Sequence, residues 1–75
     1  MRPEEIFKKI QTIIEDNFHA IISDVNTDIG FFINKDDYSE LSTLELRLEE
    51  EFKINEIDLL EVQTIKEIIN LIQKI

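Results

Sequence analysis

Apolar residues recur at helical spacing in three separate parts of the chain. The first part runs from Pro3 to about Asn17. Pro3 suits the first helical position, where a missing N–H costs no hydrogen bond, and Glu4 and Glu5 favour the positive end of the helix dipole. The apolar positions that predict this first helix are Ile6, Phe7, Ile10, Ile13, Ile14 and Phe18.

The second helical pattern runs from about Tyr38 to Phe52. Asp36 or Asp37 is expected to cap its start by accepting an unpaired backbone N–H. Residues three or four positions apart share one side of a helix, so this helix has a predicted core face of Leu41, Leu44, Leu48 and Phe52. On roughly the opposite side the spacing places Ser39, Ser42 and Leu46.

The last helix is predicted from a capping box, in which Thr64 caps the start and Glu67 follows three residues later. It continues to Ile75, and its predicted apolar face consists of Ile65, Ile68, Ile69, Ile72 and Ile75. Before it, Asp58 and Glu61 are expected to bracket a short helix. The predicted fold class is all-α: a small four-helix bundle of three main helices and one short helix.

Between the first two helices, His19 to about Lys35 has no regular period and is predicted to be a long loop. Its apolar residues are expected to cover the core: Ile21, Ile22, Val25, Ile29, Phe31, Phe32 and Ile33. Asp24, Asn26 and Asp28 begin like a calcium-binding loop. Such a loop then requires Gly at its sixth position and Glu at its twelfth, where this chain has Ile29 and Lys35. We therefore expect turns made by local side-chain hydrogen bonds.

Composition narrows the classes of function. The 75 residues form a single expected domain, 1–75, without Cys, and 17 acidic against 8 basic residues give a net charge of −9. That charge repels nucleic acid, and it either favours a partner with a basic surface or serves only to keep the protein soluble; composition leaves both interpretations open. No apolar run is long enough to span a membrane, and the charged N-terminus does not resemble a signal peptide. A cytoplasmic monomer is the expectation.

Catalytic side chains are sparse. His19 is the single histidine, and no residue pattern orients it toward a nucleophile. Acidic residues on the helices of an acidic protein usually form a solvated face, so we expect no enzyme activity and no metal site.

The outward side of the second helix offers a clearer candidate site. There Leu46 is an apolar residue among the acids Glu45, Glu49 and Glu50. A single exposed Leu is common on protein surfaces. A Leu surrounded by acids also suits docking to a basic, partly apolar groove, and the pattern leaves both interpretations open.

Three segments together resemble the acyl carrier protein family. "EEIFKKI" (Glu4 to Ile10) is similar to the family's first helix, and "LRLEEEFKI" (Leu46 to Ile54) is similar to the end of its acidic second helix. "TIKEIINLI" (Thr64 to Ile72) is similar to its last helix. The resemblance covers nearly all of the chain. It implies a four-helix bundle with a long first loop.

The resemblance also implies a function. Family members carry a 4'-phosphopantetheine arm on a serine at the start of the second helix, usually within Asp-Ser-Leu. The thiol of the arm holds an acyl group as a thioester for enzymes of fatty acid or polyketide biosynthesis. The implied partners are a phosphopantetheinyl transferase and acyl-processing enzymes with basic docking patches. Glu45, Glu49 and Glu50 would then dock electrostatically, and Leu46 would supply apolar contact.

The chain departs from the family at the serine motif, because Asp-Ser-Leu does not occur. Different alignments place Tyr38, Asp37 or Glu40 at the serine position. Ser39 lies one residue from the ungapped position, at a helix start that favours an attached phosphate, and is the candidate attachment site. The alternative is an unmodified protein-interaction module of the same fold, which binds a basic partner through its acidic second helix.

Overall fold

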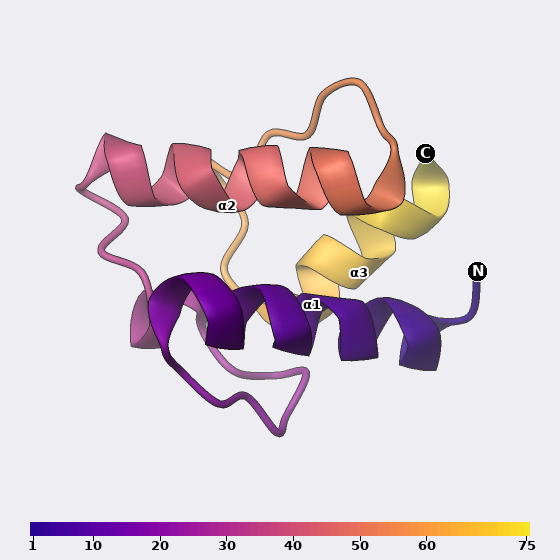
Figure 1. The fold of residues 1–75 in the computed structure, drawn as a ribbon, viewed down its shortest axis with the longest axis horizontal. Helices are drawn as coiled ribbons and strands as arrows, with labels where there is room; N and C mark the ends of the chain where they lie inside the picture. The colour runs from indigo at the N-terminus through magenta and orange to yellow at the C-terminus, as the bar shows by residue number, and fades with distance from the viewer.

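The computed structural model describes residues 1–75 and contains three α-helices, one turn of 3-10 helix and no β-strand (Figure 1). The α-helices are α1 (Pro3–Phe18), α2 (Tyr38–Phe52) and α3 (Ile65–Lys74), and the 3-10 turn is η1 (Ile29–Phe31). α1 packs against both α2 and α3. Figure 1 shows α1 and α2 running in opposite directions, with both chain termini at the same end of the molecule.

The helix boundaries agree closely with the spacing in the sequence. α1 begins at Pro3 and ends one residue later than predicted, and α2 has the predicted bounds. His19 ends α1 in the left-handed conformation with φ 55°, and its N–H donates to the carbonyl of Glu15. Lys53 ends α2 in the same way. Both residues satisfy carbonyl groups that a helix end leaves unpaired.

The core is wholly apolar, and no polar side chain is buried in it. The predicted faces of the helices are confirmed, since they bury Ile6, Ile10, Ile13, Ile14, Leu41, Leu44, Leu48, Ile65, Ile68, Ile69 and Ile72. Phe7, Phe18 and Phe52 pack against this core while half-buried. Ile75 is 66% exposed, contrary to its predicted place on the core face, because α3 ends at Lys74.

The loop between α1 and α2 covers the core as predicted, through buried Ile22, Ile29 and Ile33. Two of its apolar residues were wrongly expected to do the same: Ile21 is 80% exposed and Phe31 is 70% exposed. Backbone groups of the loop form hydrogen bonds with particular partners, and these hydrogen bonds orient the side chains of the loop. For example, the carbonyl of Ile22 accepts a hydrogen bond of 2.7 Å from the Gln11 side chain.

A second set of hydrogen bonds joins this loop to the start of α3. The N–H of Ile29 donates to the Gln63 carbonyl at 2.8 Å, and the N–H of Lys66 donates to the Val25 carbonyl at 2.8 Å. Thr64 caps α3 as predicted, with its hydroxyl accepting from the N–H of Glu67. The loop therefore has fixed backbone partners despite its irregular sequence.

The predicted short helix at Asp58–Glu61 is not formed, and a turn takes its place. The N–H of Leu60 donates to the side chain of Asp58, and the N–H of Val62 donates to the Leu59 carbonyl. The preceding N–H groups of Ile57 and Leu59 are held by side chains of α2. These hydrogen bonds fix the course of the chain before the turn through residues far away in the sequence, which local spacing does not indicate.

None of the helices has the length and apolar character that crossing a bilayer requires.

Candidate functional site

The first turn of α2 presents an exposed serine next to its capping residue. Asp37 is the N-cap, and its Oδ1 accepts the N–H of Ser39 at 3.0 Å. The same oxygen accepts the hydroxyl hydrogen of Ser39 at 2.6 Å. The Ser39 side chain lies on the exposed surface. Because its hydrogen is given to Asp37, the lone pairs of the Ser39 oxygen remain available to solvent or to a reactant.

These contacts also change the acidity of the cap. The hydrogen bond from the Ser39 hydroxyl, together with the one from the Ser39 N–H, holds the pKa of the Asp37 carboxyl below its ordinary value. Asp37 therefore remains an ionised cap over a wider pH range than a free aspartate. Of the two capping candidates in the sequence, Asp37 is the one that binds the helix start, whereas Asp36 donates its own N–H to Asn34.

The outward side of α2 carries Ser39, Ser42, Leu46 and Glu50, all of which are exposed. Leu46 is 50% exposed, whereas Leu48 on the core side is fully buried. The predicted division of the helix into two faces is confirmed at these residues. Glu50 pairs with Arg47 at 3.0 Å, and Arg47 also donates to the side chain of Asn17 on α1. Glu50 thus lies on the flank of α2 that is tied to α1.

Glu45 and Glu49 bind backbone groups of the segment that follows α2, which the sequence did not indicate. Glu45 accepts the N–H of Leu59 at 2.9 Å, and Glu49 accepts the N–H of Ile57 at 3.0 Å. Both acids are half-buried between α2 and the segment that follows it. One oxygen of each carboxylate is therefore engaged in holding the chain in place, and only the other is available for a partner.

These contacts create a groove that we call the acidic groove, between α2 and the segment 56–60. It has a volume of about 290 Å³ and is lined by Tyr38, Glu45, Glu49, Glu56, Ile57, Asp58 and Leu60. Tyr38 is 72% exposed and Leu60 is 53% exposed. The sequence did not indicate that Tyr38, Glu56, Asp58 and Leu60 are neighbours of the candidate docking residues. Local spacing carries no signal for them, since the 56–60 segment is not helical.

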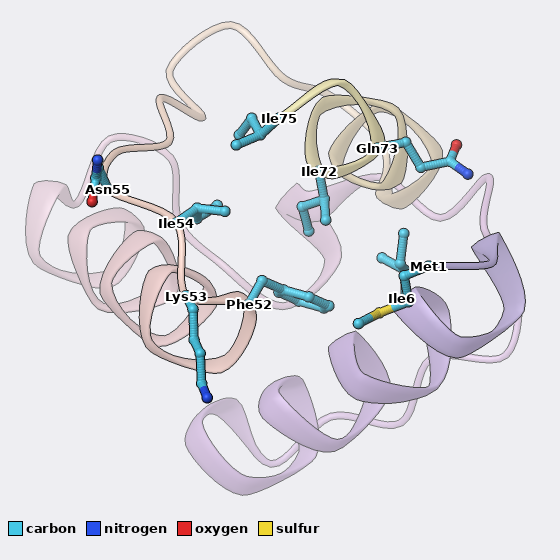
Figure 2. Close-up of a pocket in the computed structure, with 9 residues that line it drawn as sticks. All are labelled: Met1, Ile6, Phe52, Lys53, Ile54, Asn55, Ile72, Gln73 and Ile75. Carbon is cyan, nitrogen blue, oxygen red and sulfur yellow. The ribbon is translucent and has the colours of Figure 1, made fainter.

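A separate pocket with a mostly apolar lining lies at the far end of α2, about 20 Å from Ser39 along the helix axis at 1.5 Å per residue. It has a volume of about 520 Å³, and Figure 2 shows the residues that line it from both ends of the chain and the end of α2. Ile6, Phe52 and Ile72 supply part of its apolar wall. Its distance from Ser39 separates it from the candidate site.

The calcium-like stretch of the loop forms turns instead. The side chain of Asp24 accepts the N–H of Asn26 at 2.8 Å, and that of Asp28 accepts the N–H of Gly30 at 2.7 Å. The expectation of local hydrogen bonds is confirmed. The structure brings no three His, Asp or Glu side chains together in a metal-binding arrangement, and His19 is exposed at the end of α1.

No family model, no curated protein and no solved structure matches the chain significantly. The features that support a function are therefore those of the molecule itself. They are the capped, exposed Ser39 and the acidic and apolar surface around Leu46.

Proposed function

We propose that the protein is an acyl-carrier-like protein that holds an acyl or related group on a phosphopantetheine arm attached to Ser39. The observation that carries this proposal is the exposed Ser39 hydroxyl in the first turn of an acidic helix, held by its cap at 2.6 Å. The arrangement of three helices with a long ordered first loop is compatible with the resemblance in the sequence. In this proposal the turn at Asp58–Glu61 corresponds to the short helix of a four-helix bundle.

The residues around Ser39 fit such a group. Ser39 is exposed, and before modification Asp37 orients its oxygen by accepting its hydrogen. The N-terminal turn of α2 favours the negative phosphate diester that would join Ser39 to the arm. When bound, the arm supplies a thiol that carries the acyl group as a thioester.

The same proposal assigns a docking role to the outward side of α2. Leu46 would enter an apolar spot on the partner, and Glu45, Glu49 and Glu50 would face its basic residues. Electrostatic attraction of this kind speeds encounter more than it strengthens the complex. The partners we propose are a phosphopantetheinyl transferase and acyl-processing enzymes, with the carrier acting as a cytoplasmic monomer and as a substrate, without activity of its own.

The test is direct modification. The protein is incubated with coenzyme A and a broad-specificity phosphopantetheinyl transferase, and its intact mass is measured. We expect a gain of one phosphopantetheine that is lost in Ser39→Ala and kept in the matched control Ser42→Ala. Absence of any gain with several transferases would contradict the carrier function.

A second candidate function is an interaction module without an arm. It is favoured by the acidic groove, whose carboxylates and exposed Tyr38 and Leu60 do not depend on Ser39. The unmodified protein should then bind a synthetic amphipathic helix with Lys on one face and Leu on the other. Calorimetry should show weaker binding for Leu60→Ala, in the groove, than for Ile21→Ala, an exposed control on the loop. Equal binding by both variants argues against docking through the acidic groove.

A further inference from the structure

An open groove lies beside Ser39, between the end of α1 and the start of α2. We call it the aromatic groove. Its volume is about 380 Å³, and its lining includes Phe18, His19, Phe32, Ser39, Glu40 and Thr43. The rings of Phe18 and Phe32 pack together with centroids 5.9 Å apart, and both side chains are half-buried. Part of each of the two rings therefore remains accessible from the groove.

Ser39 thus stands between two grooves of different charge. The acidic groove, which begins at the neighbouring Tyr38, is lined by four carboxylates and no basic residue. The aromatic groove is lined by one carboxylate, Glu40, which already accepts the N–H of Asn34. Its wall at Asn17 is hydrogen-bonded to the Arg47 guanidinium. The phosphate that joins the arm to Ser39 is repelled by the four carboxylates of the first groove more than by the single carboxylate of the second, so it turns the uncharged remainder of the arm toward the second groove.

We propose that the arm on Ser39 folds back into the aromatic groove and not into the acidic groove. This inference rests on the carrier function proposed above. The geminal methyl groups of the arm bury apolar area against the exposed parts of Phe18 and Phe32. Its amides meet the polar rim at His19 and Thr43. The acidic groove then stays free for a basic partner while the arm is sheltered on the other side of α2.

The two grooves can be told apart by NMR of the full chain before and after modification. We expect the amide shifts that change on modification to cluster at 17–19, 32 and 43, beyond the immediate neighbours of Ser39. Nuclear Overhauser effects should connect the geminal methyl protons of the arm to the ring protons of Phe32. Changes centred on Tyr38, Ile57 and Leu60, or changes confined to the neighbours of Ser39, would overturn the inference.

A matched pair of variants tests the cause. Thr43 lines the aromatic groove, whereas Ser42 is exposed outside it. In modified Thr43→Glu the added carboxylate should abolish the contacts between the arm and Phe32, and in modified Ser42→Glu the contacts should remain. Persistence of the contacts in both variants would refute the electrostatic reason. The intact mass distinguishes failure of the carrier function from failure of the groove inference. If the protein is not modified, both are overturned. If it is modified but the arm makes no contacts in the aromatic groove, only the inference is overturned.

Discussion

At the scale of single residues, the pair of Asp37 and Ser39 combines a structural and a chemical role. Asp37 caps α2 through the N–H of Ser39 and orients the Ser39 hydroxyl with the same oxygen atom. Because the folded-state pKa of Asp37 is lowered, its contribution to stability is present above the unfolded pKa of about 3.9. That contribution is lost as pH falls from there through the lower folded pKa.

We predict that Ser39→Ala raises the pKa of the Asp37 carboxyl toward its ordinary value. The variant removes the hydroxyl hydrogen bond, which is the largest cause of the lowered pKa, and it keeps the backbone N–H. The measurement is a pH titration followed by carboxyl carbon NMR. Ser42→Ala serves as the control and should leave the Asp37 titration unchanged; an unchanged titration in Ser39→Ala would show that the hydroxyl does not hold the cap.

Leu46 and Leu48 provide the second test at this scale. Leu48 is fully buried, so Leu48→Ala should lower the free energy of unfolding by about 2–5 kcal/mol through lost burial and a new cavity. Leu46 is half exposed, and Leu46→Ala should change the free energy of unfolding by only about 0.5 kcal/mol. Urea unfolding measures both values. Equal losses in the two variants would mean that the outward side of α2 is wrongly assigned.

At the scale of elements, α2 acts as the support for the chain that follows it. Its core side packs inward, its outward side carries Ser39 and Leu46, and its third side binds the backbone of 57–59 through Glu45 and Glu49. The segment 53–64 is therefore ordered without forming a helix. Glu45 and Glu49 have this structural role in addition to the docking role that we propose for them, so substitutions there would affect both.

We predict that Glu45→Ala destabilises the protein by about 1–3 kcal/mol, because it leaves the N–H of Leu59 without its acceptor. Glu45→Gln keeps an acceptor oxygen while removing the charge, and should retain most of that stability. Hydrogen exchange of the Leu59 amide gives the local readout, and denaturant unfolding gives the global one. Faster exchange in the Ala variant alone is the expected result, and equal exchange in both would contradict it.

The start of α3 offers a third prediction at this scale. Thr64→Ala should lower the free energy of unfolding by about 0.5–2 kcal/mol, since the N–H of Glu67 loses the threonine hydroxyl as its partner. Thr64→Ser retains a hydroxyl and is the matched control. Chemical denaturation compares them; a loss of the same size in Thr64→Ser would point to the missing methyl group instead of the cap.

At the scale of the whole molecule, charge opposes compactness. A net charge of −9 is held within a body of about 29 × 26 × 21 Å. The two ion pairs, Lys9–Glu51 and Arg47–Glu50, are partly exposed and stabilise the fold only weakly. Repulsion among the remaining acids therefore acts across the full width of the protein when salt is low.

We predict that the thermal midpoint rises when sodium chloride is raised from about 0.01 M to about 0.15 M, because the screening length falls from about 30 Å to about 8 Å. The first length is comparable to the longest dimension of the molecule, whereas the second spans only neighbouring groups. Calorimetry at neutral pH measures the shift. A midpoint that falls with salt would show that favourable ion pairs outweigh the repulsion.

Local pattern was enough to place the three helices and their inward faces. The spacing of Ile and Leu, the proline at the start of α1 and the cap at Thr64 act within a few residues. For the same reason the exposure of Ser39 and Leu46 followed from the angle at which each lies on α2. These features depend on hydrogen bonds and side-chain directions inside a single helix, so the sequence alone determined them.

Tertiary structure alone decided the course of the segments between helices. Ile21 and Phe31 turn outward, the stretch at Asp58–Glu61 forms a turn, and Glu45 and Glu49 hold backbone groups up to 14 residues away in the chain. The two grooves beside Ser39 also exist only because distant segments meet. Such contacts form where packing brings unpaired backbone N–H groups close to available carboxylates. No periodic pattern in the sequence predicts which of these groups come together.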